Sequence, residues 1–81
     1  MTIIIWDIKA REFLRSLPKE VANRIFRKID SEISKNVTRY LERLVGIEIY
    51  KIRIGEYRLF ADYNNDTLII RAIRHRRDAY K

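Results

Sequence analysis

The chain has 81 residues, no cysteine, one histidine and a formal net charge of +7, from 18 Lys and Arg against 11 Asp and Glu. That length supports one domain, residues 1–81, and an apolar content of 47% is enough for a core, which excludes a disordered arm. Without cysteine there is no disulfide framework, and one histidine among scattered acids predicts no metal site and no cofactor.

The N-terminal part of the chain predicts a strand followed by two helices. Residues 2–6, TIIIW, are β-branched and aromatic and indicate a short buried strand. This run is too short for a signal sequence or a membrane span, so we expect a cytoplasmic protein with no membrane contact. Asp7 is a candidate N-cap for a helix that ends at Leu17, and Pro18 suits the first turn of a second helix reaching about Lys35. The apolar stripe expected on the second helix is formed by Ala22, Phe26, Ile29 and Ile33, flanked by Val21 and Ile25.

Residues 36–45, NVTRYLERLV, begin with poor helix formers, so we expect a loop anchored by Leu41 and Leu44 in preference to a third helix. After Gly46 the pattern changes to three strands, IEIYKIRI, YRLFADY and TLIIRAIR. The order β-α-α-β-β-β predicts an α+β fold. We expect a two-layer sandwich with two N-terminal helices packed on one face of a mainly antiparallel sheet.

The first turn between these strands fixes their register. Glycine at the first position of a two-residue loop is typical of a type II′ hairpin, so Gly55-Glu56 predicts that Arg53 faces Arg58 and that Lys51 faces Phe60. Because side chains alternate along a strand, these four share one open face. The helices should cover the opposite face, which carries Tyr50, Ile52, Ile54, Tyr57, Leu59, Ala61 and Tyr63.

The second turn leaves the position of Arg71 open. A two-residue loop at Asn64-Asn65 would place Arg71 opposite Arg58, whereas a three-residue loop would place it on the other face. Like charges opposite one another destabilise a sheet. The Arg53 and Arg58 side chains could splay into water, or an anion could lie between them; with Lys51 on the same face, a phosphate-binding cleft is the better interpretation.

The C-terminal part of the chain is strongly basic. Residues 71–81 hold five Lys or Arg and one acid, a charge of +4, and residues 51–60 add +2. Such clustering predicts an anionic partner, most simply nucleic acid. On the open face Phe60 offers a ring on which an unpaired base could stack. Further candidate RNA contacts are Arg71, Arg74, His75 and Arg77.

The stretch YKIRIGEYR (residues 50–58), followed by HRRDAY (75–80), resembles the RelE branch of the RelE/ParE toxin superfamily. The resemblance covers essentially the whole chain, including the element order and the Leu44-x-Gly46 step. It implies the toxin of a type II toxin-antitoxin system with the two-layer sandwich described above. The implied activity is that of a ribosome-dependent, metal-independent endoribonuclease, an mRNA interferase. Such a toxin inhibits translation by cleaving mRNA in the ribosomal A site, through attack of a ribose 2′-hydroxyl on the next phosphate.

Carried over by position, the resemblance implies catalytic roles for Lys51, Arg53, Arg58, Arg76 and Tyr80. Lys51 or Tyr80 would take the proton of the 2′-hydroxyl, Arg58 with Arg53 would stabilise the transition state, and Arg76 would hold the leaving side. Clustered positive charge suits this chemistry, because it stabilises a phosphate dianion and makes a nearby lysine or tyrosine a better base.

The resemblance also implies partners, namely a cognate RelB-like antitoxin, the ribosome and mRNA. We expect an acidic, extended antitoxin chain to wrap the toxin in a heterocomplex, and the free toxin to be monomeric. Three alternatives stay open. One is a ParE-like gyrase poison, which shares the fold but cuts no RNA, and another is a non-catalytic nucleic-acid-binding module whose cations only position phosphates. The third is a structural module with a basic surface.

Overall fold

The computed structural model describes residues 2–44, 46 and 48–78. In chain order the elements are β1 (Ile3–Trp6), α1 (Ile8–Ser16), α2 (Lys19–Arg27), α3 (Val37–Tyr40), β2 (Glu42–Arg43), β3 (Tyr50–Ile54), β4 (Tyr57–Asn64) and β5 (Thr67–His75). None of the helices in this described part of the chain is long and apolar enough to cross a membrane.

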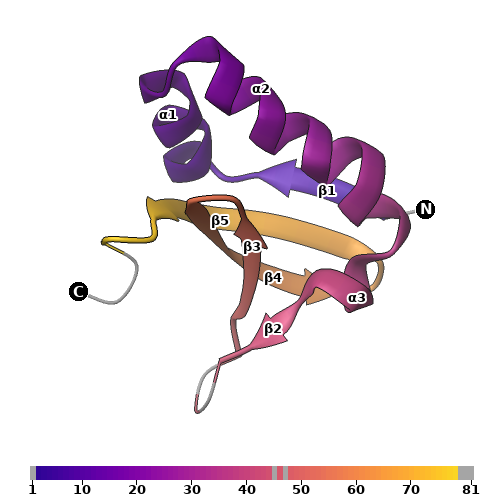
Figure 1. The fold of residues 1–81 in the computed structure, drawn as a ribbon. Helices are drawn as coiled ribbons and strands as arrows, with labels where there is room; N and C mark the ends of the chain where they lie inside the picture. Colours follow the sequence, from indigo (N-terminus) through magenta and orange to yellow (C-terminus); the bar gives the residue numbers. More distant parts are fainter. Residues whose placement is uncertain (1, 45, 47, 79–81) are drawn as a thin grey trace.

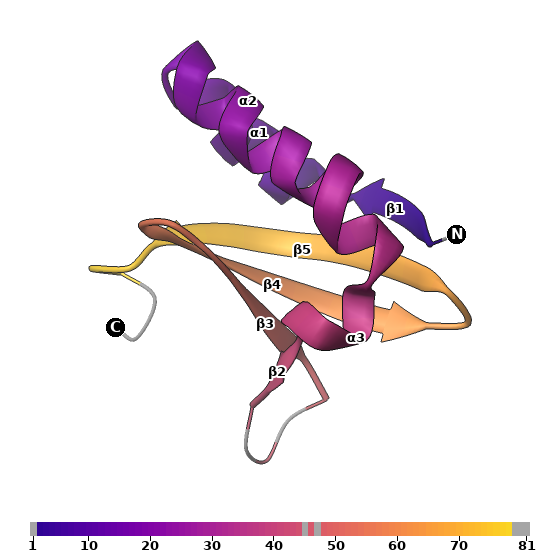
Figure 2. The same ribbon diagram turned by 45° about the vertical axis from the view of Figure 1, so that its right-hand side comes forward.

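The molecule has two layers, with α1 and α2 lying together over one face of the sheet (Figures 1 and 2). The strand order is β1-β5-β4-β3-β2. β1 runs parallel to β5, and the other neighbouring strands are antiparallel. The predicted α+β sandwich is therefore confirmed.

The helical layer follows the sequence pattern except at one aromatic residue. Asp7 caps α1 as predicted, since its carboxylate accepts a hydrogen bond of 2.8 Å from the backbone N–H of Ile8. Beyond α2 the helix continues through a π-helical turn, Lys28–Glu32, and a 3-10 turn, Ile33–Lys35, to the predicted end. Phe26 was expected in the buried stripe, but it is 48% exposed and stacks on Trp6. The buried stripe is instead formed by Ile25, Ile29 and Ile33.

The core lies between the helices and the covered face of the sheet. Strand alternation sends the inward residues of β3 and β4 into it, as predicted, and β5 adds Leu68, Ile70 and Ile73. The tyrosines at the margin of the core are half-buried. The buried apolar residues are Ala10, Ile25, Ile29, Ile33, Val37, Ile52, Ile54, Leu59, Ala61, Leu68, Ile70 and Ile73.

Residues 36–45 were expected to form a loop, but part of this segment forms the helical turn α3 and the strand β2. Val37 is only 4% exposed, and its burial fixes the single helical turn α3. Leu41 packs against the core, and the two residues that follow it pair with β3 as the edge strand β2. The sheet therefore gains a fifth strand that the sequence pattern did not reveal.

The second hairpin turn differs from both sequence alternatives. It is a two-residue loop at Asn65-Asp66, both with positive φ (49° and 58°), the arrangement of a type I′ turn. A register shift between Phe60 and Ala61 follows in β4. Together these place Arg74 opposite Arg58, and the predicted pairing with Arg71 is wrong.

Candidate nucleic-acid interface

Three arginines stand side by side on the open face of the sheet. Arg53 of β3 pairs with Arg58 of β4, as predicted, and Arg58 pairs in turn with Arg74 of β5. We call these three residues the arginine row. Directly opposed residues have Cβ atoms about 5 Å apart. The row therefore places three positive charges across three adjacent strands, on the side away from the helices.

Arg58, at the centre of the row, is held by the backbone of its own hairpin. Its Nη1 donates hydrogen bonds of 3.1 Å to the carbonyl oxygens of Gly55 and Tyr57. Nε is buried and has no hydrogen-bond partner among the described residues. A buried donor without a partner is uncommon in folded proteins and calls for an explanation such as a ligand. The guanidinium is thus oriented before any ligand arrives.

Lys51 and Phe60 form the next pair along the same face, as predicted. Lys51 is only 7% exposed, and its ammonium lies 3.4 Å from a carboxylate oxygen of Glu42. The other oxygen of Glu42 lies 3.9 Å from Nε of Arg53. Glu42 is therefore part of the site, although no sequence pattern pointed to it. Its strand β2 has two residues, too few for any periodicity to reveal.

A second acid, Glu56, forms an ion pair with Arg76, which follows β5. Arg76 donates its backbone N–H to the carbonyl of Glu56 at 2.7 Å, and its Nε lies 2.9 Å from the Glu56 carboxylate. Arg76 is consequently fixed to the tip of the first hairpin, close to the strand ends that carry Arg53 and Arg58. The predicted catalytic cations of the described chain thus gather at one end of the sheet.

His75 is separated from the arginine row. It follows Arg74 along the strand, so it points to the helix-covered side and pairs with Tyr57, with the ring centroids 5.3 Å apart. Its Nδ1 accepts a hydrogen bond of 3.2 Å from the backbone N–H of Arg77. These contacts pack His75 against Tyr57 on the covered side, and its contact with RNA stays a prediction.

Arg71 does not join the row either. Its guanidinium forms ion pairs with Asp62 at 2.7 Å and with Asp7 at 3.5 Å. The hydrogen bond that Arg71 donates to Asp62, followed by the weaker contribution of Asp7, raises the pKa of Arg71 above its ordinary value. Arg71 therefore ties the sheet to the start of α1, and it is not brought to the row as a fourth cation.

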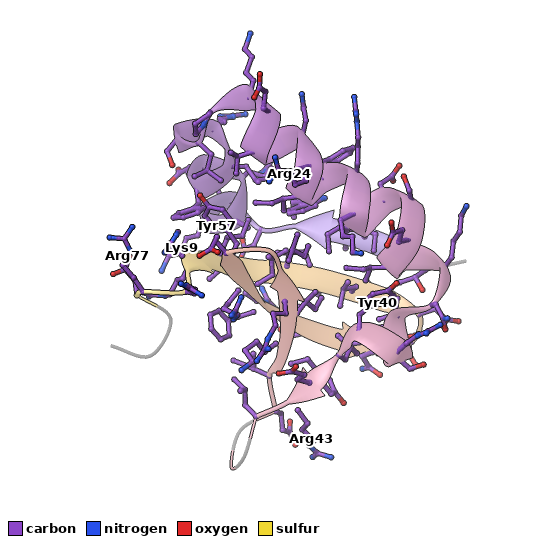
Figure 3. All side chains as sticks on the ribbon, in the orientation of Figure 1. Lys9, Arg24, Tyr40, Arg43, Tyr57 and Arg77 are labelled. Atoms are coloured by element: carbon purple, nitrogen blue, oxygen red, sulfur yellow. The ribbon has the colours of Figure 1, made fainter. Side chains whose placement is uncertain are left out.

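The remaining predicted residues lie at the end of the chain. Arg77 is exposed beyond β5. It lies far from Arg43, a residue of the edge strand β2 (Figure 3). Tyr80, the candidate base, lies outside the described residues. Within the described ranges, no group of His, Asp and Glu side chains is arranged to hold a metal ion.

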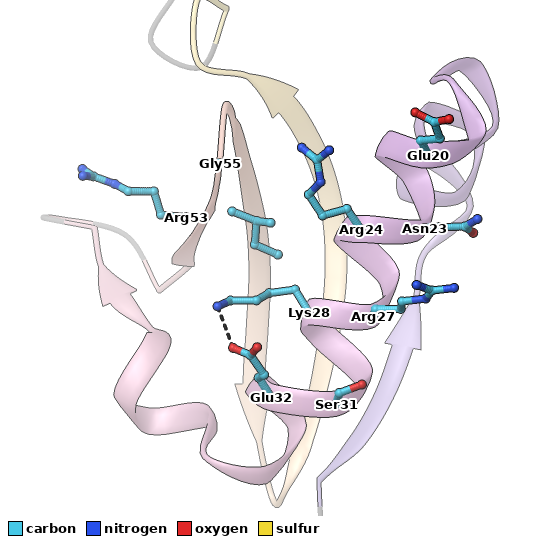
Figure 4. Close-up of a pocket in the computed structure, with 10 residues that line it drawn as sticks. Glu20, Asn23, Arg24, Arg27, Lys28, Ser31, Glu32, Arg53 and Gly55 are labelled. Atoms are coloured by element: carbon cyan, nitrogen blue, oxygen red, sulfur yellow. Dashed lines mark ion pairs between the residues drawn. The ribbon is translucent and has the colours of Figure 1, made fainter.

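A groove of about 780 Å³ lies between α2 and the first hairpin, beside the row (Figure 4). Arg53 borders it, and Arg24, Arg27 and Lys28 line it from the helix. Lys28 is neutralised by Glu32 at 2.6 Å, and that hydrogen bond raises the Lys28 pKa. Of the arginine row only Arg53 lines this groove, whereas Arg58 and Arg74 do not line it. A flat basic surface suits a polymer of phosphates, which needs no enclosed cavity.

The chain is similar to known toxins along nearly its whole length. A family model described as the ParE toxin of type II toxin-antitoxin system, parDE, matches residues 4–80. No curated protein matches the chain.

Among solved structures, the chain is similar to a toxin-antitoxin complex, RelBE, from Mycobacterium tuberculosis, at 20% identity and a TM-score of 0.82 over 91% of this chain and 96% of that one. It is similar to the RelB-RelE complex of Methanococcus jannaschii at 26% identity and a TM-score of 0.73, over 94% of both chains. The isolated E. coli RelE toxin matches at 18% identity and a TM-score of 0.72, over 93% of this chain and 84% of that one.

Proposed function

The chain belongs to the ParE toxin family of type II toxin-antitoxin systems, and on this premise we propose that it is an endoribonuclease that cleaves mRNA on the ribosome. The observation that supports this activity is the arginine row with Lys51 beside it. A row of like charges destabilises a sheet, so its presence calls for an anion that it binds. The resemblance to RelE toxins, which implies mRNA cleavage, makes RNA the first candidate, and solved structures of RelE toxins have a similar fold.

The proposed chemistry is metal-independent. The 2′-oxygen of one ribose attacks the adjacent phosphorus, its proton passes to a base, and the bond to the 5′-oxygen of the next nucleotide breaks. Negative charge grows on the phosphate oxygens along this path, and guanidinium groups fixed in advance stabilise that charge. Arg58 fits this role best because two backbone carbonyls already orient it. Arg53 and Arg74 flank the same position.

The remaining roles follow from the contacts. Lys51 forms an ion pair with Glu42, so we assign it charge stabilisation and assign Tyr80 the role of base. Arg76 serves the leaving oxygen by charge, since an arginine side chain stays protonated. Phe60 lies opposite Lys51, where its ring can stack on a base next to the scissile phosphate.

The test is toeprinting of mRNA on ribosomes with purified toxin. Arg58→Ala should lower the cleavage rate by about 100-fold to 1,000-fold, the effect of removing one positioned donor at a developing oxyanion. Arg39→Ala is the matched control, because Arg39 is an exposed arginine on α3, outside the row. Undiminished cutting by Arg58→Ala would exclude the proposed site.

A second function is favoured by the family match alone. ParE-like toxins of this fold poison gyrase, and the matching family model carries the ParE name. In that case the purified protein should inhibit DNA supercoiling and leave ribosome-bound mRNA intact. Running both assays on one preparation separates the two activities.

The partners follow from the same proposal. The similar solved structures include toxin-antitoxin complexes, and we propose that a cognate RelB-like antitoxin with an acidic extended chain binds this toxin in the cytoplasm. Ribosome and mRNA are then the other partners of the free, monomeric toxin. Co-expression with the neighbouring short gene, followed by co-purification, tests the antitoxin.

A further inference from the structure

Glu42 occupies a position that the chemistry of the open face does not require. It lies on the edge strand β2, directly opposite Lys51, and its two carboxylate oxygens face two different cations of the site. The acid therefore contacts Lys51 and Arg53 together, as a bridging phosphate would. A carboxylate and a phosphate present the same feature to a cation, a negatively charged oxygen that accepts hydrogen bonds.

The two contacts of Glu42 are loose. They measure 3.4 Å to Lys51 and 3.9 Å to Arg53, whereas charge-assisted hydrogen bonds are ordinarily about 2.7–2.9 Å. The Lys28–Glu32 pair of the same protein is much closer, at 2.6 Å. The Glu42 side chain is also 50% exposed, so water can replace its contacts at little cost. Glu42 can therefore leave when a stronger anion arrives.

We propose that Glu42 is an intramolecular counter-anion of the phosphate site, a positioning residue that holds Lys51 and Arg53 in the free toxin and is displaced by an RNA phosphate. The proposal rests on the proposed function, since it takes the phosphodiester of single-stranded RNA as the displacing anion. It explains how Lys51, which is 7% exposed, is kept in place beside the row before RNA binds. It also means that RNA competes with a carboxylate of the protein for these two cations.

The test is binding of a short single-stranded RNA that carries 2′-O-methyl groups and cannot be cleaved. Glu42→Gln removes the competing charge, so it should bind this RNA about 3-fold to 10-fold more tightly than wild type. Glu48→Gln is the matched control, because it changes the net charge equally and Glu48 is an exposed acid of the same β2–β3 connection. A gain confined to Glu42→Gln supports the proposal. Equal affinities of the two variants would overturn it.

The salt dependence provides an independent measurement. Glu42→Gln removes a negative charge that offsets part of the positive charge of Lys51 and Arg53, so RNA binding at this site should release more of the cations condensed on the RNA. The slope of log K against log salt should therefore be steeper than in wild type by about 0.7, the value for one charge on a single strand. In Glu48→Gln the slope should not change. An unchanged slope in Glu42→Gln would show that Glu42 does not occupy the phosphate site.

A conservative variant guards against a folding defect. Glu42→Asp keeps the charge on a shorter side chain and should bind RNA with an affinity between those of wild type and Glu42→Gln. If Glu42→Asp instead binds as tightly as Glu42→Gln, the charge is not what matters and the proposal fails. Because these assays use uncleavable RNA, they are independent of the cleavage assay with Arg58→Ala. Loss of the endoribonuclease proposal would leave the competition between Glu42 and RNA measurable.

Discussion

Replacing Arg74 by glutamine should stabilise the free protein at low salt, because it removes the outer charge of the arginine row. Arg74 is exposed, and no described residue forms an ion pair with it, so the substitution breaks no favourable contact of that kind. Its cross-strand partner is Arg58, which carries a like charge. Two unit charges about 6 Å apart in water repel by about 0.7 kcal/mol, and physiological salt reduces this to about 0.3 kcal/mol.

That energy is measurable by thermal unfolding. For a domain of this size 1 kcal/mol shifts Tm by about 4–8 °C, so Arg74→Gln should raise Tm by about 1–5 °C. The gain should disappear between about 10 mM and about 1 M salt, as the screening length falls from about 30 Å to about 3 Å. The same variant should bind uncleavable RNA more weakly, since it has lost one phosphate contact.

Arg71→Gln is the matched control for this experiment. It changes the net charge equally and lies on the same strand, but Arg71 forms ion pairs with Asp62 and Asp7. Arg71→Gln should therefore lower Tm, whereas Arg74→Gln should raise it. Arg71→Gln should leave the affinity for RNA nearly unchanged. A lower Tm for Arg74→Gln, or a gain that persists at high salt, would refute the view that the row is held against electrostatic repulsion.

Two further predictions concern stability. Ile29→Ala, at a fully buried position in the π-helical turn Lys28–Glu32, should lower the free energy of unfolding by about 2–5 kcal/mol, against about 0.5–1.5 kcal/mol for Ile29→Val, as measured by urea denaturation. If both variants lost the same free energy of unfolding, the surrounding side chains would have to fill the larger cavity of Ile29→Ala, and the prediction would be wrong. The Glu32 contact raises the pKa of Lys28, so its stabilising effect is full below the ordinary lysine pKa of 10.5 and is lost as pH rises through the raised value. Lys28→Met should then be less stable than wild type at pH 7 and equal to it in strong alkali, and a constant difference would contradict this.

The parts of the fold that the sequence predicted are those in which a local rule decides the outcome. Gly55, with a φ of 55°, sets the first hairpin, so the pairing of Arg53 with Arg58 could be read directly from the turn. Asp7 capped its helix as its residue type suggests. The alternation of apolar residues in β3 and β4 likewise identified the buried face.

The parts that could not be predicted depend on contacts between distant segments. The turn at Asn65-Asp66 has no glycine to mark a type I′ geometry, and the register shift after Phe60 has no sequence signal, so Arg74 was not recognised as the partner of Arg58. Edge strand β2 exists because it pairs with β3, and Glu42 reaches Lys51 only through that pairing. Half of the site is therefore a product of tertiary structure.

The parallel pairing of β1 with β5 has a consequence for how the protein is made. Ile3 pairs with Thr67, and the nearby contact between Asp7 and Arg71 joins residues 64 positions apart. During synthesis the first strand must wait, unpaired, until the last described strand has emerged. Pairing over such a separation is slow, because much of the chain must be ordered before the contact forms. The same strand supplies Arg74, so the arginine row is completed in the step that closes the sheet. A nascent chain that ends before residues 67–75 therefore lacks the complete row that we propose as the RNA-binding surface.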